Sequence, residues 1–413
     1  MKRRVVITGL GAITPVGHDV KETWENLLKG VSGFAEIKHF DATNFSTRFA
    51  AEVKNYNTEE HFDTKEGRKL DLYTQYALVA AREAITDAGL KDAALDCDRV
   101  GVITGAGIGG IWTLEEEIGK FIAGGPRRIS PFFIPKMISN IAAAQIAIEH
   151  GFKGVNFNIT SACASANHAI GTAFRTIQYG DADVIISGGT EAAVTPVAVA
   201  GFAALRAIST RNDDPKTSSR PFDKDRDGFV MAEGAAILVL EELEHALARG
   251  AKIYAELAGY GATDDAYHIT APLEDGSGSS KCMQMALKDA GLKPEDIQYI
   301  NAHGTSTPLN DKGETMSIKN AFGEHAYKLK INSTKSMVGH MLGAAAGIEA
   351  ITCCKTIETG WIHPTMNLMN PDPDCDLDYV PNQAIQFQVN AALSNSLGFG
   401  GHNSAIIIKK YNA

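Results

Sequence analysis

Short apolar, β-branched runs alternate with longer amphipathic segments throughout the chain. The runs predict strands, and the segments between them have the spacing of apolar side chains that is typical of helices. Apolar strands separated by helices favour an α/β fold with a mostly parallel sheet covered on both faces. We expect strands at residues 4–9, 99–105, 154–160, 182–189, 235–242, 297–304, 328–334 and 391–400, and the clearest helices at 73–90, 279–292 and 341–360.

The pattern repeats weakly between two parts of the chain. Residues 157–180 and 330–360 each begin with a strand ending in Asn and Ser or Thr, pass through a polar turn and end in a helix rich in Ala and Gly. The helices at 81–90 and 285–292 also resemble each other, and each ends at a glycine able to cap it. The repeat fits either chance similarity or two similar halves, 1–250 and 251–413, in one compact unit.

Composition and charge narrow the class of protein. The chain of 413 residues is 44% hydrophobic and 21% charged, as in globular proteins, and its net charge of −10 argues against nucleic acid or membrane partners. No run approaches the ~18 apolar residues of a membrane span. Six cysteines without metal-ligand spacing indicate reduced thiols in a cytoplasmic protein.

Three motifs resemble ligand-binding loops but each lacks a required part. GAGIGG (105–110) has dinucleotide-loop spacing, yet residues 121–148 contain no acidic residue for the ribose. TGLGAITPVG (8–17) has Pro15 where the phosphate-binding helix should begin. DKDRDGFVMAEG (223–234) resembles an EF-hand loop, but its twelfth residue is Gly234 instead of glutamate. We expect close-packed turns and a structural loop instead.

One cysteine lies among very small residues. Cys163, in SACASA (161–166), follows the strand at 154–160 and precedes a helix expected to begin near Ala164. The N–H groups and dipole of a helix N-terminus lower the pKa of a thiol below its usual ~8.5 and favour the thiolate. Small neighbours leave room for a substrate and leave backbone amides to hold an oxyanion. This stretch alone also fits a buried, inert cysteine.

Two histidines lie at comparable junctions of strand and helix. His303 directly follows the strand IQYI (297–300), and His340 is expected at the start of a helix, five residues after Lys335. Each histidine alone is more often structural than catalytic. Sites in parallel sheets form at the carboxyl ends of strands, so we expect these side chains and Cys163 to meet.

Five motifs together resemble the elongating β-ketoacyl-acyl carrier protein synthases, and the type II enzymes more than type I. The resemblance implies a thiolase-like, five-layered αβαβα fold of two pseudo-symmetric halves, and a homodimer. A type I synthase and a polyketide-type ketosynthase remain as alternatives. The motifs are SACASA (161–166), RPFDKDRDGFVMAEGA (220–235), NAHGTSTPLND (301–311), STKSMVGHMLGAAAGIEA (333–350) and NSLGFGGHNSA (395–405).

The resemblance also implies a reaction. An acyl group arrives on the phosphopantetheine of acyl carrier protein, and Cys163 takes it as a thioester. Malonyl-acyl carrier protein then loses CO2, and neutral His303 and His340 stabilise the enolate that attacks the acyl-enzyme. Lys335 tunes the electrostatics around His340, and Glu349 organises the network. The chemistry requires no cofactor beyond the carrier protein's phosphopantetheine.

Further residues receive roles from the same resemblance. The N–H groups of Cys163 and Phe399 would hold the tetrahedral oxyanion, and Phe399 would gate the site from the GFGG loop (398–401), with Gly400 as part of the hinge. Ile108 and Phe202 would line the acyl pocket, although plain packing fits them equally well. Thr305 and Thr307 would hold the pantetheine amides, and a monovalent cation would lie at Asn301, Glu349, Ser394 and Asn395.

A basic patch is the candidate surface for the carrier protein. Asp63 and Glu66 resemble an N-cap pair, so a helix is expected to begin near Thr64. An ordinary solvated face explains the cations that follow equally well, but the resemblance favours an acidic carrier protein as partner. The patch comprises Lys65, Arg68 and Lys69 on one face, extended by Arg127, Arg128 and Arg206.

Overall fold

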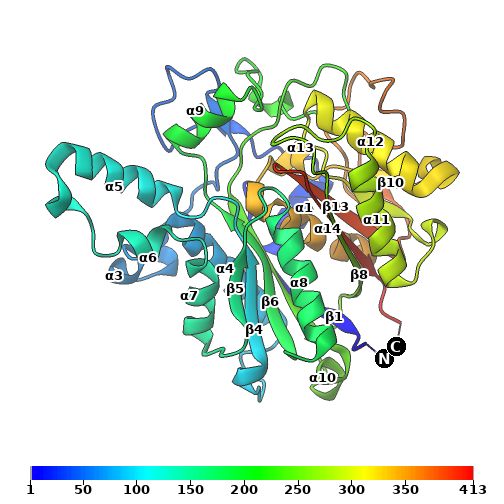
Figure 1. Cartoon of the computed structure of the whole chain (residues 1–413), viewed down its shortest axis with the longest axis horizontal. Coiled ribbons are helices and arrows are strands. Elements are labelled where there is room, and N and C mark those ends of the chain that lie inside the picture. Colours follow the sequence, from blue (N-terminus) through cyan, green and yellow to red (C-terminus); the bar gives the residue numbers. More distant parts are fainter. Residues whose placement is uncertain (1, 413) are drawn as a thin grey trace.

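Ten strands form one hydrogen-bonded sheet in the computed structural model, which describes residues 2–412 (Figure 1). Two further pairs of very short strands lie outside the sheet: β2 (Ala35–Glu36) with β3 (Phe49–Ala50), and β11 (Trp361–Ile362) with β12 (Ile385–Gln386). The strands of the sheet are β1 (Val5–Ile13), β4 (Val100–Gly105), β5 (Asn156–Ile159), β6 (Val184–Glu191), β7 (Gly234–Glu242), β8 (Ala255–Asp264), β9 (Tyr299–Asn301), β10 (Lys330–Asn332), β13 (Ala391–Gly398) and β14 (His402–Lys409).

Helices lie between most of these strands. Those expected at 73–90, 279–292 and 341–360 are confirmed, and the last begins with a 3₁₀ turn at Leu342–Ala344. The helices are α1 (Val20–Leu28), α2 (Thr58–His61), α3 (Thr64–Gly67), α4 (Leu72–Asp87), α5 (Ile111–Gly124), α6 (Phe133–Met137), α7 (Ile141–His150), α8 (Ser165–Tyr179), α9 (Pro196–Ala204), α10 (Leu243–Ala248), α11 (Ser277–Ala290), α12 (Pro308–Phe322), α13 (Lys335–Val338) and α14 (Ala345–Thr359).

The sheet consists of two runs of five strands with the same internal order. One run is β1-β7-β6-β4-β5 and the other is β8-β14-β13-β9-β10, and they join where Val5–Ile7 pairs with Ala255–Leu257. Helices α4 and α7 pack on the outer face of the first run, and α11 packs on that of the second, with α12 against it. Helices α8 and α14 contact each other and strands of both runs, so the layers alternate as αβαβα.

The prediction of a mostly parallel sheet is wrong. Within each run, the two pairs at the outer end are parallel, as in β4 with β5 and with β6, but β7 and β14 pair antiparallel with both of their neighbours. Strands buried on both faces are apolar whichever way they run, so their composition does not reveal their direction. Strands β8 and β14 were not expected, because glycine and polar residues interrupt their apolar pattern.

Paired glycines explain one of the misleading motifs and support the repeat. A Cβ at Gly11 of β1 would lie 2.0 Å from the carbonyl oxygen of Ala80 in α4. At the equivalent place in β8, a Cβ at Gly261 would lie 2.2 Å from the carbonyl oxygen of Cys282 in α11. In both runs, glycine therefore lets a helix on the outer face approach the first strand closely. TGLGAITPVG (8–17) is a packing motif.

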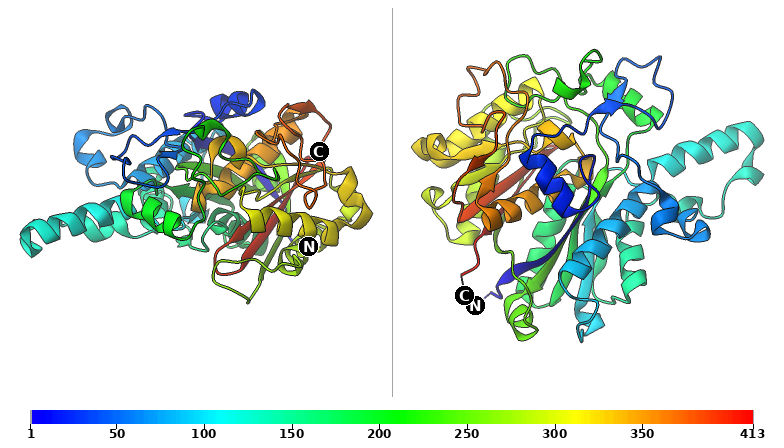
Figure 2. Two further views of the ribbon diagram at one scale, coloured as in Figure 1. Left: turned by 90° about the horizontal axis from the view of Figure 1, so that it is seen from above. Right: turned by 180° about the vertical axis from the view of Figure 1, so that it is seen from behind.

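An arm projects from one side of the molecule (Figures 1 and 2). It comprises residues 111–137, from α5 through α6, and it carries exposed apolar side chains, among them Phe121, Ile122 and Ile134. Both ends of the described chain lie on the side of the molecule away from the arm (Figure 2). None of the helices described combines the length and the apolar character that crossing a membrane requires.

Candidate active site

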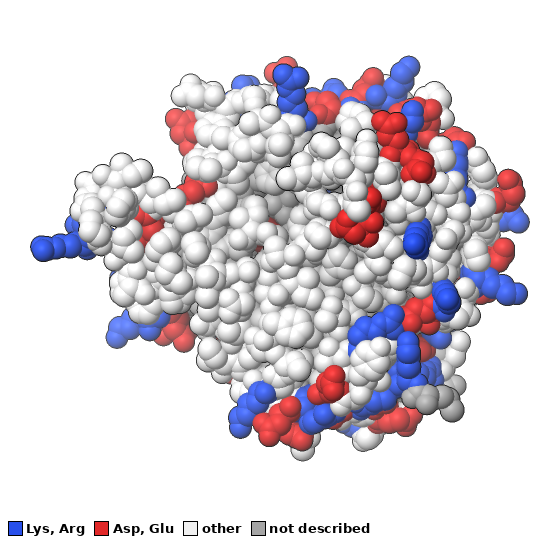
Figure 3. All heavy atoms as spheres, in the orientation of Figure 1, with Lys and Arg blue, Asp and Glu red and all other residues white. Residues whose placement is uncertain are grey.

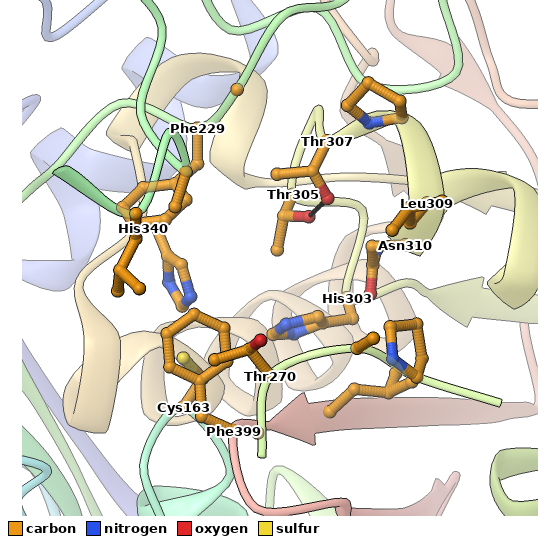
Figure 4. Close-up of a pocket in the computed structure, with 18 of the residues that line it drawn as sticks. Cys163, Phe229, Thr270, His303, Thr305, Thr307, Leu309, Asn310, His340 and Phe399 are labelled. Carbon is orange, nitrogen blue, oxygen red and sulfur yellow. Dashed lines mark hydrogen bonds between the residues drawn. The ribbon is translucent and has the colours of Figure 1, made fainter. Parts of the chain in front are cut away.

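The three expected reactive residues meet in one pocket of about 370 Å³ (Figure 4). Cys163 follows β5, and His303 follows β9, as expected. His340 lies between α13 and α14, ahead of the 3₁₀ turn, rather than at a helix N-terminus. These side chains, from both five-strand runs, line the same cavity. The pocket walls also include Phe202, Arg206, Phe229, Thr305, Thr307 and Phe399.

A tight turn presents Cys163 at the start of α8. Ala162 has a φ of +50°, and Ser165 secures the turn by accepting a hydrogen bond from the Ser161 N–H (2.9 Å) and donating one to the Ala162 carbonyl (2.6 Å). Helix α8 begins at Ser165, so the predicted helix N-terminus next to the cysteine is confirmed. The small residues of SACASA fit because the turn is packed closely: a Cβ at Gly105 of β4 would lie 2.4 Å from the Ser165 carbonyl carbon.

The expected lowering of the thiol pKa is wrong for the enzyme without substrate. Burial raises the pKa of Cys163 to about 12, and this effect outweighs the nearby charge of Lys335, which lowers it. The carboxylates of Glu191 and Glu349 raise it further. Cys163 is half-buried in an apolar pocket, where desolvation disfavours the thiolate more than the helix end favours it. Cys163 is therefore a thiol rather than a thiolate at neutral pH.

Polar contacts hold both the backbone and the ring of His303 in place. The backbone N–H of His303 donates a hydrogen bond to Glu314 Oε1 (2.6 Å). The other oxygen of Glu314 accepts one from the backbone N–H of Gly304 (2.7 Å). The Lys335 Nζ lies 3.3 Å from His303 Nδ1 and donates to the His303 carbonyl (2.7 Å). An ammonium can only donate, so Nδ1 is the acceptor and the imidazole proton is on Nε2. Sequence reasoning missed Glu314, a buried acid on α12 whose only signal was its place shortly after the histidine motif.

Lys335 and Glu349 form a fully buried ion pair beside the histidines. The ammonium donates to Glu349 Oε1 as well as to His303. The expectation that Lys335 influences His340 is confirmed in direction, since its charge contributes to lowering the pKa of that imidazole. Its direct contacts, however, are with His303. Burial raises the pKa of the Glu349 carboxyl to about 7, while Lys335 lowers it.

Both imidazoles are neutral at physiological pH, as predicted. Burial is the main cause that lowers the pKa of His303 and His340 well below the usual 6.5, and Lys335 lowers both further. The two rings meet edge to face, with centroids 5.4 Å apart. Phe229 packs against His340 in the same way at 5.1 Å. Phe229 was not singled out, because DGFV looked like part of a calcium-loop mimic.

The GFGG loop closes the pocket beside the nucleophile. A Cβ at Gly398 would lie 2.7 Å from the Ser161 carbonyl oxygen and 3.3 Å from the Cys163 nitrogen, so this loop touches the cysteine turn. Phe399 faces the pocket (Figure 4), with its ring 6.5 Å from that of Phe202. Gly400 itself does not line the pocket, and it adopts a φ of +92°, which glycine accepts readily.

Three of the five residues expected to bind substrate line the pocket, and two do not. Thr305 and Thr307 line it, with their hydroxyls 2.9 Å apart (Figure 4). Phe202 also lines it. Ile108 is absent from the lining of this pocket and is 40% exposed, so its place in an acyl pocket stays a prediction. Its backbone N–H donates a hydrogen bond to Glu191 Oε1 (3.1 Å).

Each of the four residues expected to hold a cation has one oxygen that no described residue hydrogen-bonds. Among residues 2–412, Asn301 Oδ1, Glu349 Oε2, Ser394 Oγ and Asn395 Oδ1 are all buried and accept or donate no hydrogen bond. Buried polar atoms are rarely left without partners. Four such oxygens, one of them on a carboxylate, are a donor set that suits a hard cation. The residues present therefore fit the cation that the motifs imply.

The six basic residues of the proposed patch are exposed and form no ion pair within the described chain. The expected helix start is confirmed, since Asp63 accepts hydrogen bonds from the N–H groups of Lys65 and Glu66, although α3 is only one turn long. Lys69 lies over the Phe132 ring at 5.6 Å, on the arm. Arg127 and Arg128 are in a 3₁₀ turn at the arm's tip, where Figure 3 shows basic side chains, and Arg206 lines the pocket mouth.

The remaining two motifs are structural, as expected. In the calcium-loop mimic, Asp223 accepts N–H bonds from Asp225 (2.9 Å) and Asn370 (2.7 Å). In GAGIGG (105–110), the amides that would hold a phosphate bind the carboxylate of Glu191 instead. All six cysteines are free thiols.

Comparisons with known proteins agree with this geometry. The model described as "Beta-ketoacyl synthase, N-terminal domain" matches residues 2–246, and "Beta-ketoacyl synthase, C-terminal domain" matches residues 254–369. A 3-oxoacyl-[acyl-carrier-protein] synthase 2 from Staphylococcus aureus (strain COL) is 54% identical over 411 residues, which cover 100% of this chain and 99% of the relative. The protein of the same name from Synechocystis sp. (strain ATCC 27184 / PCC 6803 / Kazusa) is 54% identical over 410 residues, 99% of each chain.

Solved structures resemble the whole chain. A ketosynthase determined in complex with a type II polyketide synthase acyl-carrier protein, and bound to a hexaketide, has a TM-score of 0.92 at 39% identity. A beta-ketoacyl synthase from Burkholderia phymatum STM815 has a TM-score of 0.92 at 36% identity. Both alignments cover 100% of each chain, which confirms the thiolase-like fold. With its cysteine and two neutral histidines in one pocket, the chain belongs to the beta-ketoacyl synthase family of condensing enzymes.

Proposed function

We propose that this enzyme elongates fatty acyl chains by two carbons, through decarboxylative condensation of malonyl-acyl carrier protein with an acyl group held on Cys163. The observation that carries the proposal is the pair of neutral imidazoles, His303 and His340, facing the pocket of the cysteine. The names of the relatives at 54% identity support the same activity.

The first half-reaction transfers the primer. The Sγ of Cys163 attacks the thioester carbonyl of acyl-carrier protein, the carbon–sulfur bond to pantetheine breaks, and the pantetheine thiol leaves with a proton. N–H groups of Cys163 and Phe399 stabilise the tetrahedral oxyanion. The closeness of Gly398 to the cysteine turn supports this assignment, because it places the Phe399 amide next to that of Cys163.

The second half-reaction forms the carbon–carbon bond. Malonyl-carrier protein releases CO2, and the electrons of the broken bond pass to the thioester as an enolate. The Nε2 protons of His303 and His340 stabilise its oxygen. The enolate carbon attacks the acyl-enzyme, the bond to Cys163 Sγ breaks, and the sulfur takes up one proton. The products are 3-oxoacyl-carrier protein, free carrier protein and CO2.

Binding of the carrier protein uses the pocket mouth and the basic patch. Thr305 and Thr307 hold the amides of the pantetheine arm, whose thioester reaches Cys163. The acyl chain lies against Phe202. Cations that form no ion pair with the described residues support docking of an acidic carrier protein: Lys65, Arg68, Lys69, Arg127, Arg128 and Arg206.

The assembly is a homodimer that works in the cytoplasm. The exposed apolar side chains of the arm support self-association, and six free cysteines support a reducing compartment. Matches of separate family models support a division into 1–250, with the nucleophile, and 251–413, with both histidines. A structural monovalent cation would be held by Asn301, Glu349, Ser394 and Asn395, where it would neutralise the unused Glu349 oxygen.

Reconstitution tests the proposal. The enzyme, acyl-carrier protein and malonyl-carrier protein are mixed, and mass spectrometry follows 3-oxoacyl-carrier protein and CO2. We expect condensation in the wild type, none after iodoacetamide treatment, and in His303→Ala or His340→Ala an acyl-enzyme that is not extended. Absence of condensation with every primer from four to sixteen carbons, in a folded enzyme, would refute the proposal.

A polyketide-type ketosynthase is the second candidate. The similarity to a ketosynthase that carries a hexaketide favours it. The same assay separates the two, because a fatty acid synthase component extends each primer once in the absence of reductases, whereas a polyketide synthase extends its unreduced product again. Extension of an unsaturated sixteen-carbon primer would favour a type II over a type I elongating enzyme.

A further inference from the structure

Glu191 is a fully buried carboxylate at the end of β6 that lies outside the catalytic set described above. Its Oε1 accepts hydrogen bonds from the N–H groups of Ile108 (3.1 Å) and Gly109 (3.0 Å). Its Oε2 accepts from Gly107 (2.7 Å) and Gly343 (3.0 Å). Four backbone donors thus surround one carboxylate, and each oxygen accepts two of them.

This carboxylate has no cationic partner among residues 2–412. Consecutive N–H groups in a glycine loop form the kind of concavity that binds anions such as phosphate. Here the chain supplies its own anion. Burial raises the pKa of Glu191, and the four hydrogen bonds lower it. A proton on either oxygen would replace an acceptor with a donor and break at least one of these bonds, so the ionised form is the one that fits.

The two loops that Glu191 joins come from different halves of the chain. One follows β4 in the first five-strand run. The other is the 3₁₀ turn that contains Gly343, three residues after His340. They interlock without spare room: a Cβ at Gly343 would lie 2.2 Å from the Gly107 nitrogen, and a Cβ at Gly107 would lie 2.8 Å from Glu191 Oε2. Any shift of the carboxylate would therefore move the segment that carries His340.

We propose that Glu191 is a positioning residue for the decarboxylation step, because it ties the loop at Gly107–Gly109 to the segment His340–Gly343 and so sets where the His340 ring meets the enolate. The inference rests on the proposed function. It distinguishes the two half-reactions, since acyl transfer to Cys163 does not use the His340 ring. The charge of Glu191 also raises the pKa of Cys163, so removing it would favour the thiolate.

The test is Glu191→Gln, measured in both half-reactions. The amide keeps the shape of the side chain but turns one acceptor into an NH2 donor that faces N–H groups, so at least one loop loses its partner. We expect kcat for decarboxylation of malonyl-carrier protein to fall about tenfold to a hundredfold, as for a small misplacement of a catalytic group, with KM little changed. Acyl-enzyme formation should be as fast as in the wild type or faster.

Glu83→Gln is the matched control. Glu83 is a carboxylate in α4 that accepts the N–H groups of Ala12 (2.8 Å) and Val20 (2.9 Å), away from the pocket. It should leave the ratio of the two half-reactions unchanged. If Glu191→Gln does not fold, Gly107→Ala gives a milder test, because its Cβ would press on Oε2 without removing the charge.

Two results would overturn the inference: a wild-type decarboxylation rate in a folded variant, or equal losses in both half-reactions. Neither result would contradict the proposed function, provided that the wild type carries out both half-reactions. A wild-type enzyme that performs neither would refute the proposed function itself.

Discussion

Lys335 connects the buried polar groups beside the two histidines. Its ammonium touches Glu349 and both the ring and the backbone of His303, and its charge helps to keep both imidazoles neutral. The motifs led us to expect Lys335, His303 and Cys163 in one place, and the structure brings them together, because glycine and small residues mark the tight turns that hold them. They did not reveal the pKa of Cys163, because the side chains that bury the thiol come from segments far away in the chain.

Replacing Lys335 with methionine should impair both stability and catalysis. Glu349 would lose its buried cation, which costs about 3 to 5 kcal/mol of unfolding free energy, and His303 would lose the contact that fixes its proton on Nε2. We expect urea denaturation to show this loss and decarboxylation to fall about a hundredfold. Lys252→Met, which breaks the exposed pair with Glu358, should cost less than about 1 kcal/mol. Equal effects of the two substitutions would contradict this interpretation.

Alkylation of Cys163 should depend steeply on pH. Because burial raises its pKa to about 12, the thiolate fraction should increase about tenfold per pH unit from pH 6 to 9. Peptide mass spectrometry after timed iodoacetamide treatment measures the rate at Cys163 separately from that at the partly exposed Cys97. A rate that levels off near pH 7 would show a stable thiolate and contradict the assignment of a resting thiol.

The two secondary structure elements on either side of Cys163 were foreseen closely. Strand β5 and helix α8 lie within one or two residues of their expected bounds, because an apolar run, a turn of small residues and a C-terminal glycine define them. Strands β8 and β14 escaped prediction, because the glycines of β8 serve packing against α11, and buried polar residues such as Asn403 and Ser404 interrupt the apolar pattern of β14. The direction of β7 and β14 could not be foreseen either, since it depends on pairing with partners distant in sequence.

The contact of β13 with the cysteine turn allows a substitution test. In Gly398→Ala, the added methyl would lie 2.7 Å from the Ser161 carbonyl oxygen, so the GFGG loop or the turn must move. We expect acyl-enzyme formation to slow by at least about tenfold, since the Phe399 amide would leave the oxyanion.

Gly201→Ala in α9 is the control for that substitution, because an added Cβ there meets nothing within 4 Å. It should leave the rate unchanged and, as an alanine within a helix, stabilise the protein by up to about 1 kcal/mol. Wild-type acylation in Gly398→Ala would rule out a close oxyanion arrangement at this place.

For the molecule as a whole, the two five-strand runs contribute different parts of one site. The first supplies Cys163 and the second supplies His303 and His340, and α8 and α14 pack between them. The resemblance of the motifs to a known family therefore predicted the fold, whereas the weak repeat alone fitted chance similarity equally well. The paired glycines of β1 and β8 now give that repeat a physical cause.

The surface charge predicts how the carrier protein binds. The double substitution Lys65→Glu and Arg68→Glu reverses the charge at both positions. It should raise KM for acyl-carrier protein about tenfold at low salt, and less at high salt, because an acidic partner loses two attractions. Rates with a short acyl-pantetheine should not change. The control is Lys281→Glu with Lys288→Glu, which reverses the charge of two exposed lysines on α11 and should have little effect on KM. Equal effects of both pairs would contradict a specific docking patch.

The covalent intermediate decides whether this chemistry is correct. The enzyme is incubated with acyl-carrier protein and no malonyl donor, then analysed by intact mass and by peptide mapping. We expect one acyl group per chain, on the peptide containing Cys163, which disappears when malonyl-carrier protein is added and never forms in Cys163→Ala. An acyl group on another residue, or 3-oxoacyl product made by Cys163→Ala, would show that the sulfur at position 163 is not the nucleophile.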